Sequence, residues 1–135
     1  MQILLDTHYL LWFLFGDRRI TKDIENIISD PENDIFYSTA SLWEIDIKHK
    51  KHPDLFPYTS KEIADECLNV NIENLPIFNK HIYQLNSLKK INNAPEHNDP
   101  FDLMLLAQAK RSRLLLLTCD HAFKYYDEEC ILLVE

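Results

Sequence analysis

Five short apolar segments are spaced along the chain, and longer segments with a helical pattern of apolar residues separate them. Runs such as LLLL and ILLV lack polar alternation, which is typical of strands that are buried on both faces. Strands that alternate with helices form a mostly parallel sheet covered on both sides, so the sequence predicts a three-layer α/β/α fold. The predicted strands cover residues 2–6, 34–39, 71–77, 113–118 and 130–134.

The segments between these strands repeat apolar residues at helical spacing. Ser38 or Thr39 is the candidate N-cap of the third helix, because a short hydroxyl side chain satisfies the free amides of a first turn. Residues 48–59 and 91–100 combine charges with prolines and are predicted loops. The predicted helices cover residues 9–15, 21–28, 42–50, 60–68, 79–88 and 100–111.

The totals limit what the chain can be. Its 135 residues, 46% of them hydrophobic, suffice for one core, and we expect a single domain over residues 1–135. One glycine excludes a glycine-rich phosphate loop. Cys67, Cys119 and Cys130 form no CxxC pair, so we interpret them as small core side chains. The apolar segment 9–15 is too short to span a bilayer, and we expect a soluble, cytoplasmic protein without a membrane partner.

The formal net charge of −8 argues against a protein that coats nucleic acid through bulk electrostatics. It does not exclude a nuclease, because a carboxylate site that holds divalent cations is itself acidic in sequence.

Four acids stand where predicted elements end or begin. Asp6 and Asp120 follow two strands, and the carboxyl ends of parallel strands meet at the edge of the sheet where ligands bind. Glu44 and Asp102 lie at the start of helices that lead away from the same edge. Taken singly, each acid has a simpler interpretation as a helix cap or first-turn residue. Taken together, they would repel one another unless a cation lies between them. An all-oxygen set favours Mg²⁺ or Mn²⁺, which can activate water against a phosphodiester.

Four blocks of the sequence together resemble the PIN-domain family, and within it the VapC-type toxins of bacterial toxin–antitoxin pairs. The blocks are LLDTHYLLWFL, STASLWEIDIKHK, HNDPFDLMLLAQA and LLTCDHAFKYY, and they extend over essentially the whole chain. Each block alone is a weak signal, whereas all four in this order are specific. The resemblance implies a PIN-like fold and a Mg²⁺- or Mn²⁺-dependent endoribonuclease that cleaves RNA. It also implies an antitoxin encoded beside the toxin and, often, a homodimer.

Carried over by position, the family's acidic site falls on the four acids already singled out. Asp99 is either an accessory metal ligand or only the cap of the following helix, and we favour the cap. Thr7 and Thr118 are candidates to hold a carboxylate or a metal-bound water, although both hydroxyls have a simpler use in local backbone bonds. Catalytic and metal-binding roles are thus predicted for Asp6, Glu44, Asp102 and Asp120.

One position departs from the family pattern. Similar sequences usually read DPFDR in the third block, whereas Leu103 follows Asp102 here, so a basic residue expected near the acids is missing. This departure motivates an alternative from another class, a catalytically silent PIN-like module that binds RNA or protein. A hydrolase of small phosphate esters shares the acids, but the family resemblance points to nucleic acid.

Contacts to RNA are the least specific part of the prediction. Lys48, Lys50 and Lys51 are candidate phosphate ligands, although a lysine run is usually a solvated helix end. Arg111 and Arg113 precede a strand and are expected at the opposite edge of the sheet. The surplus apolar area of segment 9–15 would suit an antitoxin segment, a second copy of the chain, or burial in the core. Four aromatic residues are interpreted as core rather than as base-stacking platforms, namely Trp12, Phe13, Phe15 and Trp43.

Overall fold

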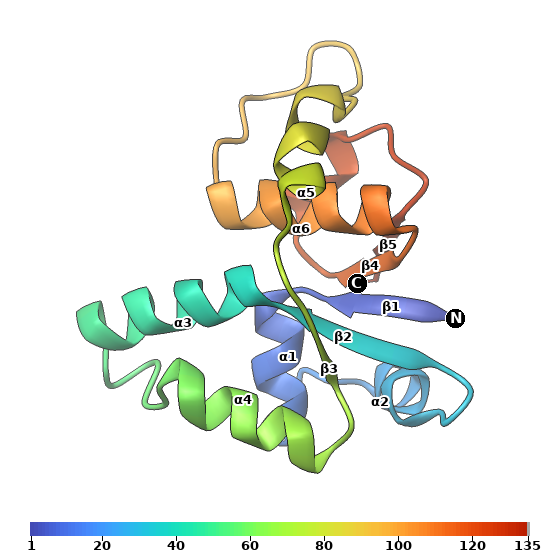
Figure 1. Ribbon diagram of the computed structural model, residues 1–135. Helices are drawn as coiled ribbons and strands as arrows, with labels where there is room; N and C mark the ends of the chain where they lie inside the picture. The colour runs from blue at the N-terminus through green and yellow to red at the C-terminus, as the bar shows by residue number, and fades with distance from the viewer. Residues whose placement is uncertain (135) are drawn as a thin grey trace.

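The five predicted strands form one sheet in the order β3-β2-β1-β4-β5 (Figure 1). The computed structural model describes residues 1–134. Neighbouring strands of this sheet pair in parallel, with Leu4 opposite both Phe36 and Leu116. The predicted strands are confirmed, with observed bounds β1 (Gln2–Leu5), β2 (Asp34–Ser38), β3 (Glu73–Leu75), β4 (Leu115–Thr118) and β5 (Ile131–Leu133).

The predicted helices are also confirmed, with two corrections. The expected helix over 79–88 is an α-helix followed by a 3₁₀ turn, η1 (Leu85–Ser87). The expected loop over 48–59 begins at residue 52, because the third helix continues through the KHKK stretch, where basic side chains favour a helix C-terminus. The helices are α1 (Thr7–Leu14), α2 (Lys22–Ser29), α3 (Thr39–Lys51), α4 (Ser60–Asn69), α5 (Asn79–Gln84) and α6 (Pro100–Ser112), and a second 3₁₀ turn is η2 (His121–Tyr125).

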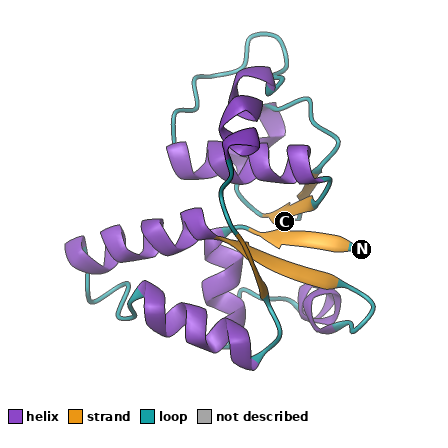
Figure 2. Cartoon of the chain, viewed as in Figure 1, coloured by secondary structure: helices purple, strands orange, loops and turns teal. Residues whose placement is uncertain are grey.

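The strand order explains the three layers (Figure 2). From β1 to β2 to β3 the chain steps in one direction, so right-handed crossovers place α1 to α4 on one face of the sheet. The return from β3 to β4 runs in the other direction and places α5 and α6 on the opposite face. The chain therefore reverses its winding at β1 and β4, the position where open α/β sheets bind ligands.

Alternation along β1 divides the core between the two faces. Leu5 belongs to a cluster with Leu10 of α1 and Ile63 of α4, whereas Leu4 packs with Leu105 of α6 and its neighbours. Cys67 is buried, and Cys119 and Cys130 are partly buried and free, which agrees with their interpretation as core side chains. Within residues 1–134, each helix is too short or too polar to cross a bilayer.

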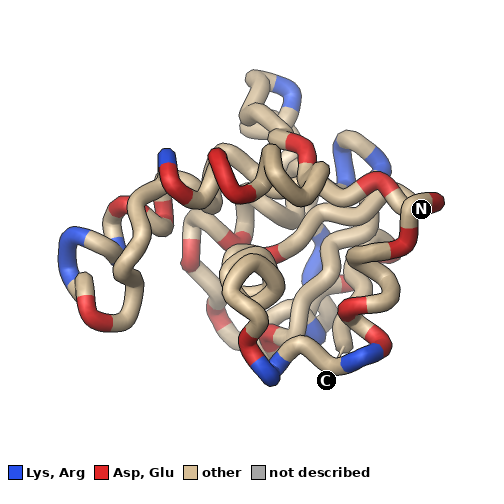
Figure 3. The backbone as a smooth tube through the Cα atoms, turned by 90° about the horizontal axis from the view of Figure 1, so that it is seen from below, with Lys and Arg blue, Asp and Glu red and all other residues tan. Residues whose placement is uncertain are grey.

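The interpretation of the aromatic residues as core is wrong for two of them. Trp12 and Phe13 are partly buried against the core, but Phe15 is 42% exposed and Trp43 is 64% exposed. Trp43 lies on the outer side of α3, and its ring contacts the ring of Phe101 at the start of α6, at 5.2 Å between ring centroids. Acidic positions are spread over much of the chain, and the basic positions form several short stretches (Figure 3).

We predict that Leu4→Ala lowers the free energy of unfolding by about 2–5 kcal/mol, because it leaves a cavity between β1 and α6. Urea denaturation monitored by circular dichroism measures the change. Leu68→Ala is the matched control, since Leu68 is 77% exposed and its truncation should shift stability by less than about 0.5 kcal/mol. Equal effects of the two variants would contradict the assignment of Leu4 to the core.

Candidate active site

Asp6 is held in place by the ends of two neighbouring strands, β1 and β4. It follows β1, is 4% exposed and caps α1 through Oδ1, which accepts from the Tyr9 amide at 2.9 Å. Its Oδ2 accepts from the Thr118 hydroxyl at the end of β4, at 2.5 Å. The amide of Asp6 also donates to the Leu117 carbonyl at 3.1 Å, which extends the pairing of the two strands. The position of this carboxylate is therefore set by the end of the sheet itself.

Asp120 lies beside Asp6, two residues beyond the end of β4. Its Oδ1 accepts from the Ala122 amide at 2.9 Å and so caps η2. Its own amide donates to the Thr118 hydroxyl oxygen at 3.0 Å. One threonine hydroxyl thus joins the carboxylate of Asp6 to the backbone of Asp120. Thr7 differs, because its hydroxyl bonds to the Ser41 hydroxyl of α3 at 2.8 Å.

Two acids come from the start of α6. Asp99 is exposed and is the N-cap, with Oδ1 accepting from the amides of Phe101 and Asp102 at 2.9 and 3.2 Å. Asp99 therefore caps α6, as the favoured interpretation expects, and its accessory role toward a metal stays a prediction. Asp102 lies in the first turn, and its Oδ2 is 3.0 Å from Nε2 of His97.

Glu44 comes from α3 and is 6% exposed. The alternative that it is a first-turn acid is wrong, because α3 begins at Thr39 and Glu44 lies in the second turn. Its Oε2 pairs with Nζ of Lys48, one turn later, at 2.7 Å. Lys48, a predicted RNA contact, is therefore already engaged with a predicted site acid.

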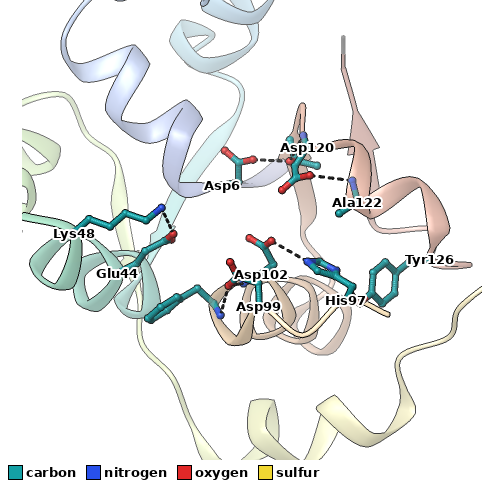
Figure 4. Close-up of polar contacts among 11 residues, drawn as sticks. Asp6, Glu44, Lys48, His97, Asp99, Asp102, Asp120, Ala122 and Tyr126 are labelled. Atoms are coloured by element: carbon teal, nitrogen blue, oxygen red, sulfur yellow. Dashed lines mark hydrogen bonds and ion pairs between the residues drawn. The ribbon is translucent and has the colours of Figure 1, made fainter. Parts of the chain in front are cut away.

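The predicted acids face one region of the structure (Figure 4). Asp6, Asp102 and Asp120 point toward a common space, with Glu44 and Asp99 at its border. Burial raises the pKa of Asp6, although the bonds from Thr118 and the Tyr9 amide oppose this, and repulsion from Asp120 adds to the rise. Burial raises the pKa of Asp102 to about 7, with repulsion from Asp99 and Asp120 and an opposing bond from His97. These carboxylates are thus close enough to repel one another.

A divalent cation suits this donor set. The side chains are carboxylates at a buried edge, the chemistry preferred by Mg²⁺ and Mn²⁺, and a cation would offset their mutual repulsion. Among the described residues, however, side chains of His, Cys, Asp and Glu do not gather three or more at a time in a metal-binding arrangement.

The structure also brings in residues that sequence reasoning missed. His97 contacts Asp102, and its other ring nitrogen, Nδ1, is 3.0 Å from the Tyr126 hydroxyl. His97 belongs to the HxDPFD block and Tyr126 ends the LLTCDHAFKYY block, but nothing in either block indicates that the two side chains meet. Leu103, which replaces the usual arginine, packs against the core cluster around Leu4 instead of joining the acids.

Comparison with known proteins gives one family and several solved structures of similar fold. A family model described as PIN domain matches residues 3–129. The VapBC2 structure of Rickettsia felis, bound to a DNA fragment from its promoter, is similar at a TM-score of 0.68 and 16% identity, with all of both chains covered. The structure of VapBC-1 of nontypeable Haemophilus influenzae is similar at a TM-score of 0.58 and 17% identity, with 93% of this chain and 90% of that one covered. A domain of a functionally unknown protein from Methanocaldococcus jannaschii is similar at a TM-score of 0.55 and 14% identity, with 99% of this chain and 91% of that one covered. The search of curated proteins finds no match.

We predict that Asp102 makes the metal-free protein less stable as the pH rises. Its pKa of about 7 in the folded protein exceeds the ordinary value of 3.8, so the folded state binds the proton more tightly. The contribution of Asp102 to stability is therefore fully present below the ordinary pKa and is lost as the pH rises through about 7. In EDTA, the wild type should lose several degrees of Tm between about pH 5 and about pH 8, and Asp102→Asn should reduce this loss.

Thermal unfolding followed by circular dichroism measures both proteins across this range. Asp65→Asn is the control, because Asp65 is exposed on α4, and it should keep the wild-type dependence. An Asp102→Asn profile that parallels the wild type would refute the assignment.

Proposed function

The chain belongs to the PIN-domain family, and from this premise we propose that it is a Mg²⁺- or Mn²⁺-dependent endoribonuclease that acts as a VapC-type toxin. The observation that supports the proposal is that Asp6, Asp102 and Asp120, which come from separate elements, point toward a common space at the carboxyl edge of the sheet, with Glu44 at its border (Figure 4). Asp6, Glu44, Asp102 and Asp120 would hold the metal, and Asp99 would lie at the margin. A divalent cation bound there polarises the phosphodiester and lowers the pKa of a water molecule.

The other side chains hold these acids in place. Thr118 and the Tyr9 amide orient both oxygens of Asp6, so this carboxylate is prepared before any cation arrives. Lys48 offsets the charge of Glu44, which is otherwise buried in α3. Thr7 acts indirectly, since its bond to Ser41 ties the first turn of α1 to α3.

The solved VapBC structures support a protein partner as part of the proposal. A cavity of about 470 Å³ lies between α1 and the connection from α3 to α4, lined by Trp12, Phe15, Leu55 and Tyr58. Phe15, Leu55 and Tyr58 are 42%, 75% and 39% exposed there, so the cavity presents a contiguous apolar surface. We assign this groove to an apolar segment of the cognate antitoxin, in the cytoplasm, and expect the toxin to form a homodimer.

RNA must be held against a net charge of −8. Lys50 and Lys51 are exposed at the end of α3 and are available for phosphates, whereas Lys48 is paired with Glu44. Trp43 adjoins Glu44 in sequence, and its ring meets Phe101 at an interplanar angle of 81°, so Phe101 leaves at least one indole face uncovered. Stacking of an unpaired base on that face would bind RNA without cationic groups.

We predict that Asp6→Asn lowers RNA cleavage at least a hundredfold, because a neutral amide is a poor metal ligand at the centre of the site. Replacing a residue that only hydrogen-bonds to a metal ligand already lowers metal affinity or activity by up to roughly a hundredfold. Cleavage of a cellular RNA pool by the purified, partner-free chain should require Mn²⁺ and stop in EDTA. Asp65→Asn on the surface of α4 is the control and should cleave normally.

The same assay distinguishes the silent module that Leu103 suggests. A folded, partner-free wild type that leaves RNA intact with Mn²⁺ would overturn the nuclease. In that case Leu103→Arg would show whether the missing arginine limits activity. Cleavage by the wild type that persists in Asp6→Asn would instead overturn the assignment of the site.

We predict that Trp43→Ala weakens binding of single-stranded RNA by roughly 5- to 100-fold, the effect of losing one stacked base, while Trp43→Phe retains most of the affinity. Fluorescence anisotropy with a labelled oligonucleotide in EDTA measures binding without cleavage. Tyr83→Ala is the matched control, because Tyr83 is an aromatic residue 69% exposed on α5. Unchanged RNA affinity with altered oligomer size would instead assign Trp43 to contact between copies.

A further inference from the structure

The segment before α6 carries a largely buried histidine that the proposed chemistry does not use. The side chain of His97 is 14% exposed. Its Nε2 lies 3.0 Å from Oδ2 of Asp102, and its Nδ1 lies 3.0 Å from the Tyr126 hydroxyl. Its ring also packs edge-on against Phe123 at 5.8 Å. Figure 4 shows His97 between Asp102 and Tyr126. Both polar atoms of the ring are therefore committed to defined partners.

The chemistry of the three groups gives the row of hydrogen bonds a direction. An ionised carboxylate can only accept, so Nε2 of His97 donates to Asp102. In a neutral imidazole the other nitrogen is then an acceptor, and the Tyr126 hydroxyl donates to it. The ionised carboxylate thus selects the tautomer that presents the Nε2 N–H to it, and the tyrosine hydroxyl satisfies the remaining ring nitrogen. The arrangement fixes which way Asp102 faces.

The row also connects two elements that each supply a predicted metal ligand. Tyr126 directly follows η2 as its C-cap, and Asp120 directly precedes η2 as its N-cap. The end of η2 is held further by the Ile91 amide, which donates to the Tyr125 carbonyl at 2.9 Å, and by an antiparallel bridge between Lys90 and Tyr126. Residues 91–99 therefore run from the end of η2 to the start of α6, with His97 bonded across them.

We propose that His97 is a positioning residue that, together with Tyr126, holds the Asp102 carboxylate in the orientation and at the separation from Asp120 that a divalent cation needs. The proposal rests on the metal site of the proposed function and deepens it. Residues that hydrogen-bond to a ligand in this way typically change metal affinity about 10- to 100-fold when they are replaced. A purely structural histidine would instead affect folding and leave the affinity of the folded protein unchanged.

The experiment is a calorimetric titration of the full-length, partner-free chain with Mn²⁺. His97→Ala should weaken binding about 10- to 100-fold. His97→Gln should recover most of this loss, because its amide nitrogen can occupy the place of Nε2 and donate to Asp102. Tyr126→Phe, which keeps the ring and removes the hydroxyl, should weaken binding severalfold. Tyr125→Phe is the matched control at the adjacent position and should bind like the wild type.

Thermal unfolding of each variant in EDTA separates metal affinity from folding. If His97→Ala does not fold, the comparison of His97→Gln, Tyr126→Phe and Tyr125→Phe still decides the matter. Wild-type affinity in folded His97→Ala, or in Tyr126→Phe when His97→Ala is unfolded, would overturn the positioning role while the proposed nuclease stands. A wild type that binds no Mn²⁺ would overturn the metal site and the role of His97 together.

Discussion

The hydrogen bond from the Thr118 hydroxyl to the Asp6 carboxylate is the contact on which the site depends. It joins the ends of β1 and β4, the two strands between which the chain reverses its winding. A carboxylate that is 4% exposed is costly unless donors surround it, and here the Tyr9 amide supplies the second bond. Since the same threonine oxygen accepts from the Asp120 amide, the two strand ends cannot move apart without exposing a buried charge.

Capping and metal binding are compatible uses of the same side chains. Asp6, Asp99 and Asp120 are all observed N-caps, so the simpler interpretation of each is correct as far as it goes. Asp6 and Asp120 follow β1 and β4, and Asp99 begins the helix that leads back to β4, so these three caps lie at the carboxyl edge of the sheet. Capping therefore brings these carboxylates to one edge, and it uses only Oδ1 of Asp120 and Asp99 in the contacts described. What distinguishes a metal site from three separate helix caps is the closeness of these carboxylates to one another, and not the geometry of each cap.

Local patterns predicted the elements and the acids, because strand length, apolar spacing and caps are properties of neighbouring residues. They failed where the outcome depends on distant packing. Trp43 looks like a core residue in sequence and is exposed, since α3 turns its other side to the sheet. The KHKK stretch looks like a loop but continues α3. The contact between His97 and Tyr126 joins residues 29 positions apart, and that between Asp6 and Thr118 joins residues 112 apart. Contacts between residues so far apart in the sequence leave no periodic pattern from which they could be predicted.

The charge balance at the site implies an order of events for the proposed nuclease. Lys48 contacts Glu44 and His97 contacts Asp102, so Lys48 is already paired, and His8 lies close enough to lower the pKa of Asp6. With the guanidinium of the family pattern replaced by Leu103, a phosphate that approaches Asp6, Asp102 and Asp120 meets mainly negative charge. Cation binding would remove this barrier, so metal and RNA should favour each other's binding by the same factor. The acids would then disfavour RNA in the metal-free protein, and exposed groups such as Trp43 would have to hold the strand there without help from charge.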